Sequence, residues 1–495
     1  MVRTRNVPPA AAAMIESLRG LGYTTATAIA DLIDNSIGAE ATLVDIRFAW
    51  NDADSWIRIA DNGKGMSDAD LESAMRLGAR DPREARDPGD LGRFGMGLKT
   101  ASFSQARILT VASRAKDQGE CCLRWDLENL GNDAGHWLLH EGSRPGSEER
   151  LLADCACDTG TVVLWENLDR IVTDGFSAQD MIDLADEVET HLAMIFHRLL
   201  DDGMTILLNG QQIRGWDPFL VGHPGKAVES LEYRFLHAPG VVAQCHVLPH
   251  KDLLKPGEYE DAAGPGGWAA QQGFYIYRNR RLLLAGGWLG LGQRGRRWTR
   301  DEPHRLARIR LDIPNSADSE WKINILKSAA SVPVRLRSQF VKLGSETREA
   351  ARRVFAHRGR LVTAGGQPGG SLPDVWGARR SPKGISYRIS RDHDLVAALL
   401  DRAGPMKADL LSMLRLIEET VPVQRIWLDT AEQDDTPKGE FAEAASGEIA
   451  DTLASMFEAL VEFRGMDPDD ARQRLARTPP FDRYPEIVAE IGRKN

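Results

Sequence analysis

The sequence predicts an α+β protein with an N-terminal α/β sandwich, a second α+β domain and a mainly helical C-terminal region. Three observations predict this class. Apolar residues recur at helical spacing over residues 25–37, and two stretches rich in Val, Ile, Phe and Trp follow directly. Over residues 395–495 the apolar pattern again has a helical period. A chain of 495 residues has room for three such parts at about 150 residues per domain.

The N-terminal part, residues 1–170, alternates helical and strand-like segments. Val, Ile, Phe and Trp at residues 42–50 and 55–60 predict a β-hairpin, because the connecting residues Asn-Asp-Ala-Asp form turns readily. Helices are expected at residues 25–37, 67–77 and 99–105, and a strand at residues 162–165. A loop rich in Pro, Asp and Arg, residues 78–90, lies between the second and third of these helices.

The second domain is expected at residues 171–345. It begins with one long helix at residues 181–200, and its strands are expected at residues 204–208, 233–235, 241–248, 274–277 and 307–313. A linker region, residues 346–394, contains the Gly/Pro-rich stretch TAGGQPGGSL. The helical C-terminal region takes up residues 395–495.

Composition and charge restrict the classes of function. Lys and Arg number 62 against 72 Asp and Glu, so the net charge is −10 and any contact with nucleic acid needs a local basic surface. We find no run of about 18 apolar residues, and we expect a cytoplasmic protein that does not contact a membrane. Five cysteines, an odd number, favour reduced thiols over a disulfide framework.

Three short motifs carry chemistry, and two of them come first along the chain. Asp31 and Asn35 are four residues apart, which places a carboxylate and an amide oxygen on one helical face, able to hold a water and a metal ion. Asp61-Asn62-Gly63-Lys64-Gly65-Met66 follows a strand, so the Asp61 carboxylate can accept a hydrogen bond from an exocyclic amine. Gly63 and Gly65 permit close approach of the backbone.

A third motif, Gly92-Arg93-Phe94-Gly95-Met96-Gly97-Leu98-Lys99, is a glycine-rich turn that opens a helix. Free backbone amides at such a turn, together with the Lys99 ammonium, suit a chain of phosphates. Each motif alone is a weak signal, because glycine pairs are common in turns. Their order and spacing together are a strong one.

In that order and spacing the sequence resembles the GHKL ATPase superfamily, which includes DNA gyrase, heat-shock chaperone ATPases, histidine kinases and MutL. The resemblance implies a Bergerat-type ATP-binding domain that uses ATP and Mg²⁺, with Asn35 as the Mg²⁺ ligand. It implies that Asp61 and Thr161 contact adenine and that residues 78–91 form a mobile lid. The remaining nucleotide contacts that it implies are Gly63, Gly65, Met66, Gly92, Phe94, Gly95, Met96, Gly97, Leu98 and Lys99.

The segments ATAIADLIDNS, GRFGMGLKTAS, GFYIYRNRRLL and LDIPNSADSEWKINILKS look like MORC-type ATPases and their bacterial relatives over roughly residues 10–340. In that family a transducer domain supplies a lysine to the γ-phosphate. Lys327, after the strand-like residues 321–326, is the first choice for this lysine, and Lys322 is the alternative.

The sequence departs from the family at the general base, which is usually Glu and here is Asp31. A carboxylate about 1.5 Å further back can cost on the order of 10²-fold in rate. Asp34 is a poorer base candidate, and we expect it to point toward the lid or to cap a neighbouring helix.

Residues 278–310 hold ten arginines against two acids, interleaved with Trp288 and Trp298. Such a cluster could grip a phosphate backbone, or it could serve as sheet-edge charge and interface. Its arginines are Arg278, Arg280, Arg281, Arg294, Arg296, Arg297, Arg300, Arg305, Arg308 and Arg310.

The leading functional hypothesis is an ATP-operated clamp, in which ATP closes the lid and joins the N-terminal domains of a homodimer on duplex DNA. By family analogy the clamp acts in prokaryotic anti-phage defence, with a nuclease or a helicase as a partner protein. A protein-remodelling ATPase of the chaperone type and a non-hydrolysing nucleotide-dependent scaffold are the alternatives. We reject a histidine kinase, because no His precedes the Asp31 helix as a phosphoacceptor. A gyrase-like topoisomerase is disfavoured, because the C-terminal region shows no cleavage signature.

Overall fold

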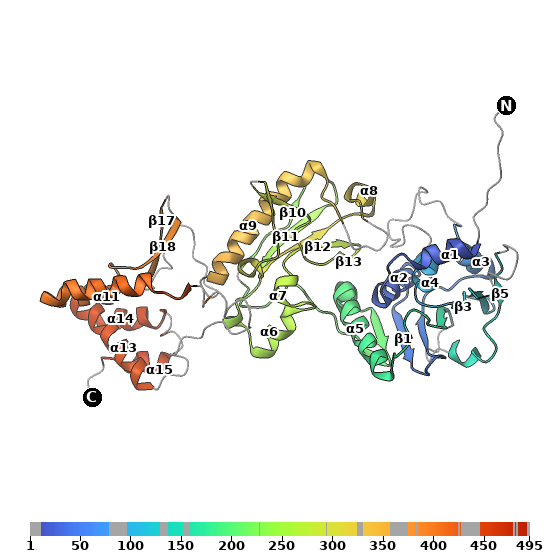
Figure 1. Ribbon diagram of the computed structural model, residues 1–495, viewed down its shortest axis with the longest axis horizontal. Helices are drawn as coiled ribbons and strands as arrows, with labels where there is room; N and C mark the ends of the chain where they lie inside the picture. Colours follow the sequence, from blue (N-terminus) through green and yellow to red (C-terminus); the bar gives the residue numbers. More distant parts are fainter. Residues whose placement is uncertain are drawn as a thin grey trace, which may run out of the picture. The chain divides into compact units, whose positions relative to one another are not determined.

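The computed structural model divides the chain into two compact units, Met1–Arg360 and Leu361–Asn495. The structure describes residues 11–78, 97–128, 137–151, 158–226, 228–293, 295–323, 330–356, 375–381, 384–423, 426, 446–478, 481 and 484–492. Each unit has its own hydrophobic core. The α+β class expected from the sequence is confirmed (Figure 1).

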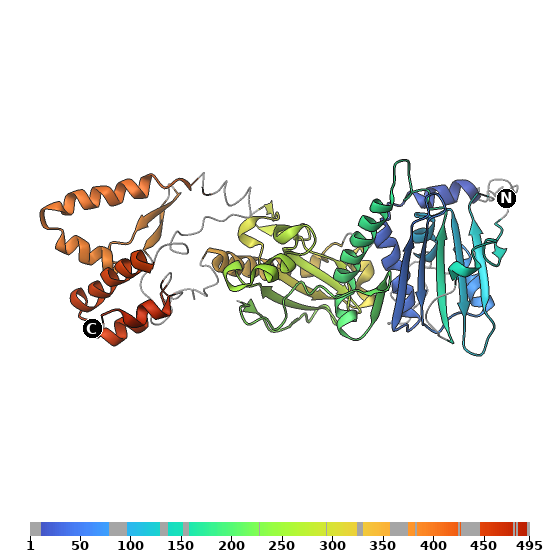
Figure 2. The same cartoon turned by 90° about the horizontal axis from the view of Figure 1, so that it is seen from below.

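An eight-stranded sheet organises the N-terminal part of the first unit, and Figure 2 shows its strands side by side. The strand order is β5-β4-β3-β6-β2-β1-β7-β8. All neighbouring pairs are antiparallel except β1 and β7, which are parallel. The strands are β1 (Leu43–Ala49), β2 (Trp56–Asp61), β3 (Ile108–Arg114), β4 (Cys121–Asp126), β5 (His140–Glu141), β6 (Gly160–Glu166), β7 (Thr205–Leu208) and β8 (Gln211–Gln212).

Alternation along the strands separates the two faces of this sheet. Ile57 and Ile59 in β2 belong to the hydrophobic core that the helices complete, whereas Arg58 between them points to the other face and pairs with Asp45 at 3.1 Å. The helices are α1 (Ala11–Arg19), α2 (Thr25–Gly38), α3 (Asp68–Met75), α4 (Gly97–Phe103) and α5 (Ala178–Asp201). The result is a two-layer sandwich, as the sequence predicted.

The core of this sandwich extends beyond residue 170, where the sequence interpretation ended the domain. Met181, Val188 and Ile206 belong to it, and the last core residue is Ile213. The reason is the parallel pairing of β7 with β1, which brings residues 205–208 back to the edge of the N-terminal sheet. A long helix followed by a strand looks, in sequence, like the start of a new domain.

A second sheet follows in the same unit, with the order β10-β11-β16-β12-β13 and with β9 paired to β11. Its strands are β9 (Val228–Glu229), β10 (Tyr233–Arg234), β11 (Val242–Val247), β12 (Gly273–Arg278), β13 (Arg281–Leu284) and β16 (Ala307–Asp312). The helix α9 (Arg337–Ala356) packs on β11 and β16 (Figure 1). Smaller elements are the hairpin β14 (Gly292–Gln293) and β15 (Arg296–Arg297) and the helices α6 (Pro256–Ala263), α7 (Gly267–Ala270) and α8 (Asp318–Trp321).

The second unit consists of a hairpin and a helical cluster with a core that includes Leu453, Leu460 and Leu475. The hairpin is β17 (Trp376–Ser381) and β18 (Gly384–Ile389), and the helices are α10 (Asp394–Arg402), α11 (Lys407–Glu419), α13 (Ser446–Glu458), α14 (Pro468–Leu475) and α15 (Pro485–Glu490). This hairpin and the end of α9 lie within residues 346–394, where a linker region was expected, and α9 crosses the boundary expected at residue 345. Within the described residues, no helix combines the length and the apolar character that a membrane span requires.

Candidate nucleotide site

The helix α2 carries the first motif. Its N-terminus is fixed by Thr24, whose hydroxyl accepts a hydrogen bond from the backbone amide of Thr27 in a capping box. Asp31, whose side chain is 11% exposed, accepts a hydrogen bond of 2.9 Å from the Tyr23 hydroxyl, and Asn35 is exposed one turn further along. The helix therefore presents a carboxylate that is held in place and an amide that is accessible.

Asp61 stands at the end of β2. Its Oδ2 accepts a hydrogen bond of 2.8 Å from the Ser36 hydroxyl, and its Oδ1 accepts one of 2.9 Å from the Gly63 amide. Burial raises the pKa of Asp61, and hydrogen bonds from Gly63, Ser36 and the backbone of Thr161 oppose that rise. Asp61 is thus a partly buried acid at the end of a strand, able to recognise one polar group of a ligand.

Thr161 lies opposite Asp61 in the register of β2 with β6. Its hydroxyl is 2.9 Å from that of Ser113 in β3, and the Ser113 hydroxyl accepts a hydrogen bond of 2.9 Å from the Met66 amide. Strand pairing therefore brings Asp61, Met66 and Thr161 together, as the sequence interpretation required. Ser113 was missed, because only the β3–β6 register places it beside Thr161.

Close packing explains one of the predicted glycines, and a second lies near Asp31. Gly65 has φ of +65°, and a Cβ there would lie 1.9 Å from the carbonyl oxygen of Arg114. A Cβ on Gly97, the first residue of α4, would lie 4.0 Å from Asp31 Oδ2. The glycine-rich motif therefore reaches the Asp31 carboxylate where α4 begins.

Lys99, in α4, is buried, and its ammonium donates hydrogen bonds of 2.7 Å to the carbonyl oxygen of Ala74 and 2.8 Å to that of Arg76. These carbonyls lie at the C-terminal end of α3, where a cation is favourable. Burial lowers the pKa of Lys99 to about 8. In this structure the ammonium is engaged by α3, and its contact with phosphate stays a prediction.

Lys99 gives the protein a defined pH dependence of stability. Its pKa is about 8 in the folded protein against an ordinary value of 10.5. Between these two pKa values the unfolded chain binds more protons than the folded protein, so the free energy of unfolding rises with pH. This gain in stability is complete above the unfolded-state pKa of 10.5 and is lost as the pH falls through the folded-state pKa of about 8. From about pH 7.5 to about pH 9.5, we expect wild type to gain on the order of 2 kcal/mol relative to Lys99→Met in urea unfolding. An equal difference at both pH values would contradict this assignment.

The other predicted residues divide into two sets. Met66 and Leu98 pack against the N-terminal core. Gly92, Phe94, Gly95, Met96 and Lys327 lie outside the described residues, so their roles stay predictions. Lys322 is exposed with φ of +50° directly after α8, so Trp321 ends a helix and does not begin the strand expected at residues 321–326.

Asp34 has a partner that the sequence interpretation did not include. It is buried, and its Oδ1 accepts a hydrogen bond of 2.9 Å from Nε of Arg281 in β13. Its carboxylate therefore faces a strand of the second sheet. Residues 79–91 of the expected lid lie outside the described residues, so a contact of Asp34 with the lid stays a prediction. The side chain of Arg281 also approaches Asp31, with 3.9 Å between Nη2 and Oδ1.

The arginine cluster does not form one surface. Four members are buried: Arg278, Arg281, Arg305 and Arg308. Two others form ion pairs, Arg280 with Asp202 and Arg310 with Glu232 and Asp312. Three exposed members, Arg296, Arg297 and Arg300, lie on and after β15. Any phosphate contact by the described arginines must therefore come mainly from this smaller group.

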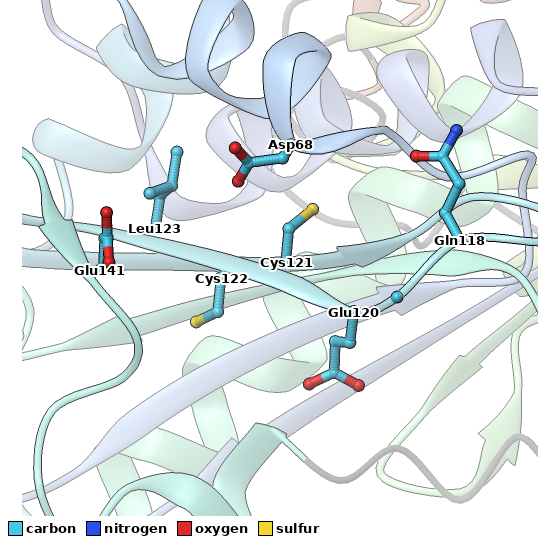
Figure 3. A pocket seen from close by; sticks show the side chains of 8 residues that line it. Asp68, Gln118, Glu120, Cys121, Cys122, Leu123 and Glu141 are labelled. Carbon is cyan, nitrogen blue, oxygen red and sulfur yellow. The ribbon is translucent and has the colours of Figure 1, made fainter.

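A hollow of about 440 Å³ lies beside β4 and α3 and contains none of the predicted nucleotide contacts. In Figure 3 the sulfur atoms of Cys121 and Cys122 point to opposite sides of the strand. Burial raises the pKa of Cys121, and that of Cys122 to about 11, so both thiols are protonated and unreactive at neutral pH. The hollow is lined by Asp68, Gln118, Gly119, Glu120, Cys121, Cys122, Leu123 and Glu141.

Residues 23–156 match the family model of histidine kinase-, DNA gyrase B-, and HSP90-like ATPases. The matched segment includes four residues of the site described above: Tyr23, Asp31, Asn35 and Asp61. This chain therefore carries a GHKL-type ATPase domain, and the enzyme class expected from the sequence is confirmed.

Two DNA mismatch repair proteins MutL are distant relatives. The protein of Shewanella sediminis is 36% identical over 110 residues, which is 22% of this chain and 17% of that protein. The protein of Shewanella piezotolerans is 26% identical over 273 residues, which is 52% of this chain and 38% of that protein. The matched segments span well under half of either relative's length.

The donor set at α2 fits a magnesium ion held mainly by a nucleotide. Within the described residues no group of three or more His, Cys, Asp and Glu side chains could form a metal site by itself. Asn35 offers one exposed amide oxygen a turn away from Asp31. One protein oxygen plus phosphate oxygens and waters is an arrangement that Mg²⁺ accepts.

Proposed function

We propose that this chain binds ATP with Mg²⁺ and hydrolyses it, with Asp31 as the general base. The observation that carries the proposal is the convergence of Asp61, Thr161 and the Gly63 amide where the paired strands β2 and β6 end, beside the helix that bears Asp31 and Asn35. An acid that recognises adenine, next to an acid that activates water, is an arrangement suited to nucleotide hydrolysis.

Each residue has its own role in the proposed reaction. Asp61 accepts a hydrogen bond from the adenine amine, and Thr161 supports it through the hydroxyl pair with Ser113. Asn35 holds Mg²⁺, which neutralises charge on the phosphates. Asp31 takes a proton from water as the water oxygen bonds to the γ-phosphorus and the bond to the β–γ bridging oxygen breaks, releasing ADP and phosphate. Tyr23 orients the Asp31 carboxylate through its hydroxyl.

The wider cycle that we propose is a clamp of the MORC type. ATP binding orders the lid and joins the N-terminal domains of a homodimer, with the energy set by the difference in affinity for the closed state. The lysine that contacts the γ-phosphate in this proposal is Lys327, with Lys322 as the alternative. DNA as the substrate is supported by the two MutL relatives, which are DNA mismatch repair proteins. A role in anti-phage defence with a nuclease or helicase partner is the further form of this proposal.

The proposal is tested by three measurements on wild-type protein: affinity for a non-hydrolysable ATP analogue, steady-state ATP hydrolysis, and oligomeric state with and without the analogue. Duplex DNA is added to each. Analogue-driven dimerisation with hydrolysis that DNA stimulates supports the clamp. Dimerisation without hydrolysis means a nucleotide switch, and absence of nucleotide binding overturns the proposal.

The three exposed arginines give a separate prediction for DNA. Neutralising Arg296, Arg297 and Arg300 together removes up to three phosphate contacts. We expect weaker binding and a salt slope, log K against log salt, smaller by about 2 to 3. Arg280→Ala is the matched control, because Arg280 is exposed but paired with Asp202 at 2.5 Å. An unchanged slope in the triple variant would exclude this surface as the DNA contact.

A second candidate function, protein remodelling of the chaperone type, is favoured by one surface of the C-terminal unit. Large apolar side chains on and around α11 are exposed, including Leu416 at 64% and Met406 at 67%. Exposed apolar patches of this kind contact polypeptides. Loss of polypeptide binding in Met413→Glu/Leu416→Glu, with DNA binding intact, would favour this candidate over the clamp.

A further inference from the structure

A buried ion pair connects the second sheet to the helix that carries the proposed base. Arg281, the first residue of β13, donates from Nε to Asp34 Oδ1 at 2.9 Å, although 247 positions separate the two residues. Their side chains are 3% and 2% exposed. Removing one partner of so deeply buried a pair destabilises the protein much more than removing one partner of a surface pair, because the remaining charge stays desolvated.

The same guanidinium is fixed on its other sides. Nη1 donates to the carbonyl oxygen of Leu282 at 2.9 Å, and Cζ lies 5.8 Å from the centre of the Phe196 ring. Phe196 belongs to α5, the helix that packs against both α2 and β13. Arg281 is thus held by β13 and α5 while it reaches into α2.

Asp31 and Asp34 are one helical turn apart, and Arg281 faces both. Its Nη2 is 3.9 Å from Asp31 Oδ1, whereas Asp31 Oδ2 accepts the hydrogen bond from Tyr23. The two carboxylate oxygens of Asp31 therefore face different groups, Arg281 and Tyr23. A small rotation of α2 would change both distances.

We propose that Arg281 is a positioning residue that sets the orientation of Asp31 by tying α2 to β13. The inference rests on the proposed function, because it assigns a task to Arg281 only if Asp31 activates water. The side chain of Asp31 is one methylene shorter than that of Glu, so the distance from its carboxylate to a bound nucleotide depends on where α2 lies. The link that Arg281 makes between β13 and α2 therefore controls hydrolysis. Asp61, with its partners Ser36 and Gly63, binds adenine independently, because Arg281 does not touch it in the described contacts.

The experiment separates turnover from binding. Arg281→Lys keeps the charge but loses the planar fork that serves Asp34 and Asp31 together. We expect kcat for ATP hydrolysis to fall about 10- to 100-fold, while the Kd of a non-hydrolysable analogue stays within about twofold of wild type. The matched control is Arg280→Lys, the preceding arginine, which is exposed and paired with Asp202; its kcat is expected to equal that of wild type.

A second variant guards against a folding defect. Asp34→Asn/Arg281→Gln removes both buried charges, so neither is left unpaired. We expect the same loss of kcat with analogue binding intact and a cooperative unfolding transition. Variants that hydrolyse ATP like wild type overturn the positioning role while the proposed function stands. Parallel loss of analogue binding and kcat also overturns it, and a wild-type protein without hydrolysis overturns the proposed function itself.

Discussion

Replacing Asp31 by Asn is expected to lower kcat for ATP hydrolysis by at least about 10²-fold. The amide has nearly the same shape and still accepts a hydrogen bond from Tyr23, but it cannot take a proton from water. Affinity for a non-hydrolysable analogue should stay within about twofold, because adenine recognition depends on Asp61. Phosphate release and calorimetric titration measure the two quantities.

The matched control is Glu187→Gln, at an exposed acid of α5. It removes one negative charge from a residue that has no assigned role in the site, and we expect wild-type turnover. Hydrolysis by Asp31→Asn at close to the wild-type rate would mean that another group activates water.

Gly65→Ala is expected to destabilise the ATPase domain by about 3 kcal/mol or more and to abolish analogue binding. Its new Cβ would lie 1.9 Å from the backbone oxygen of Arg114, so β3 or the Asp61 turn must move. Such a movement separates Met66 from Ser113 and disturbs the adenine pocket. Urea unfolding and analogue titration provide the measurements.

Gly142→Ala isolates the backbone part of this cost. Gly142 also has positive φ, +82°, but nothing lies within 4 Å of the added Cβ. We expect a loss of only about 1 kcal/mol and normal analogue binding. Equal effects of the two substitutions would show that the close approach to Arg114 is unimportant.

Local patterns predicted the helix α2, the β1–β2 hairpin and the order of the nucleotide motifs, because helical spacing and strand composition are properties of neighbouring residues. The class of ATPase domain followed from motif order. Tyr23 as a partner of Asp31 and Ser113 as a partner of Thr161 could not be predicted, since each pairing depends on packing or on strand register.

The arginines of residues 278–310 illustrate another limit. In sequence they form one basic run, but neighbouring elements cover some of them and leave others open. Arg308 and Arg310 are two residues apart in β16 and so face the same side of the sheet. Arg308 is nevertheless buried among Trp216, Trp268 and Tyr275, whereas Arg310 reaches the surface acid Glu232. Composition gives the number of charges in a segment, and only the fold determines which of them meet solvent.

The parallel pair of β1 with β7 has a consequence for how the chain acquires its fold during synthesis. Leu43 is paired with Thr205, so the edge of the N-terminal sheet has no neighbour until more than 160 further residues have left the ribosome. Before that moment β1 offers unpaired backbone groups to any other strand. The nascent ATPase domain therefore matures only when α5 and β7 have emerged, which makes a region C-terminal to the nucleotide motifs a condition for their correct assembly.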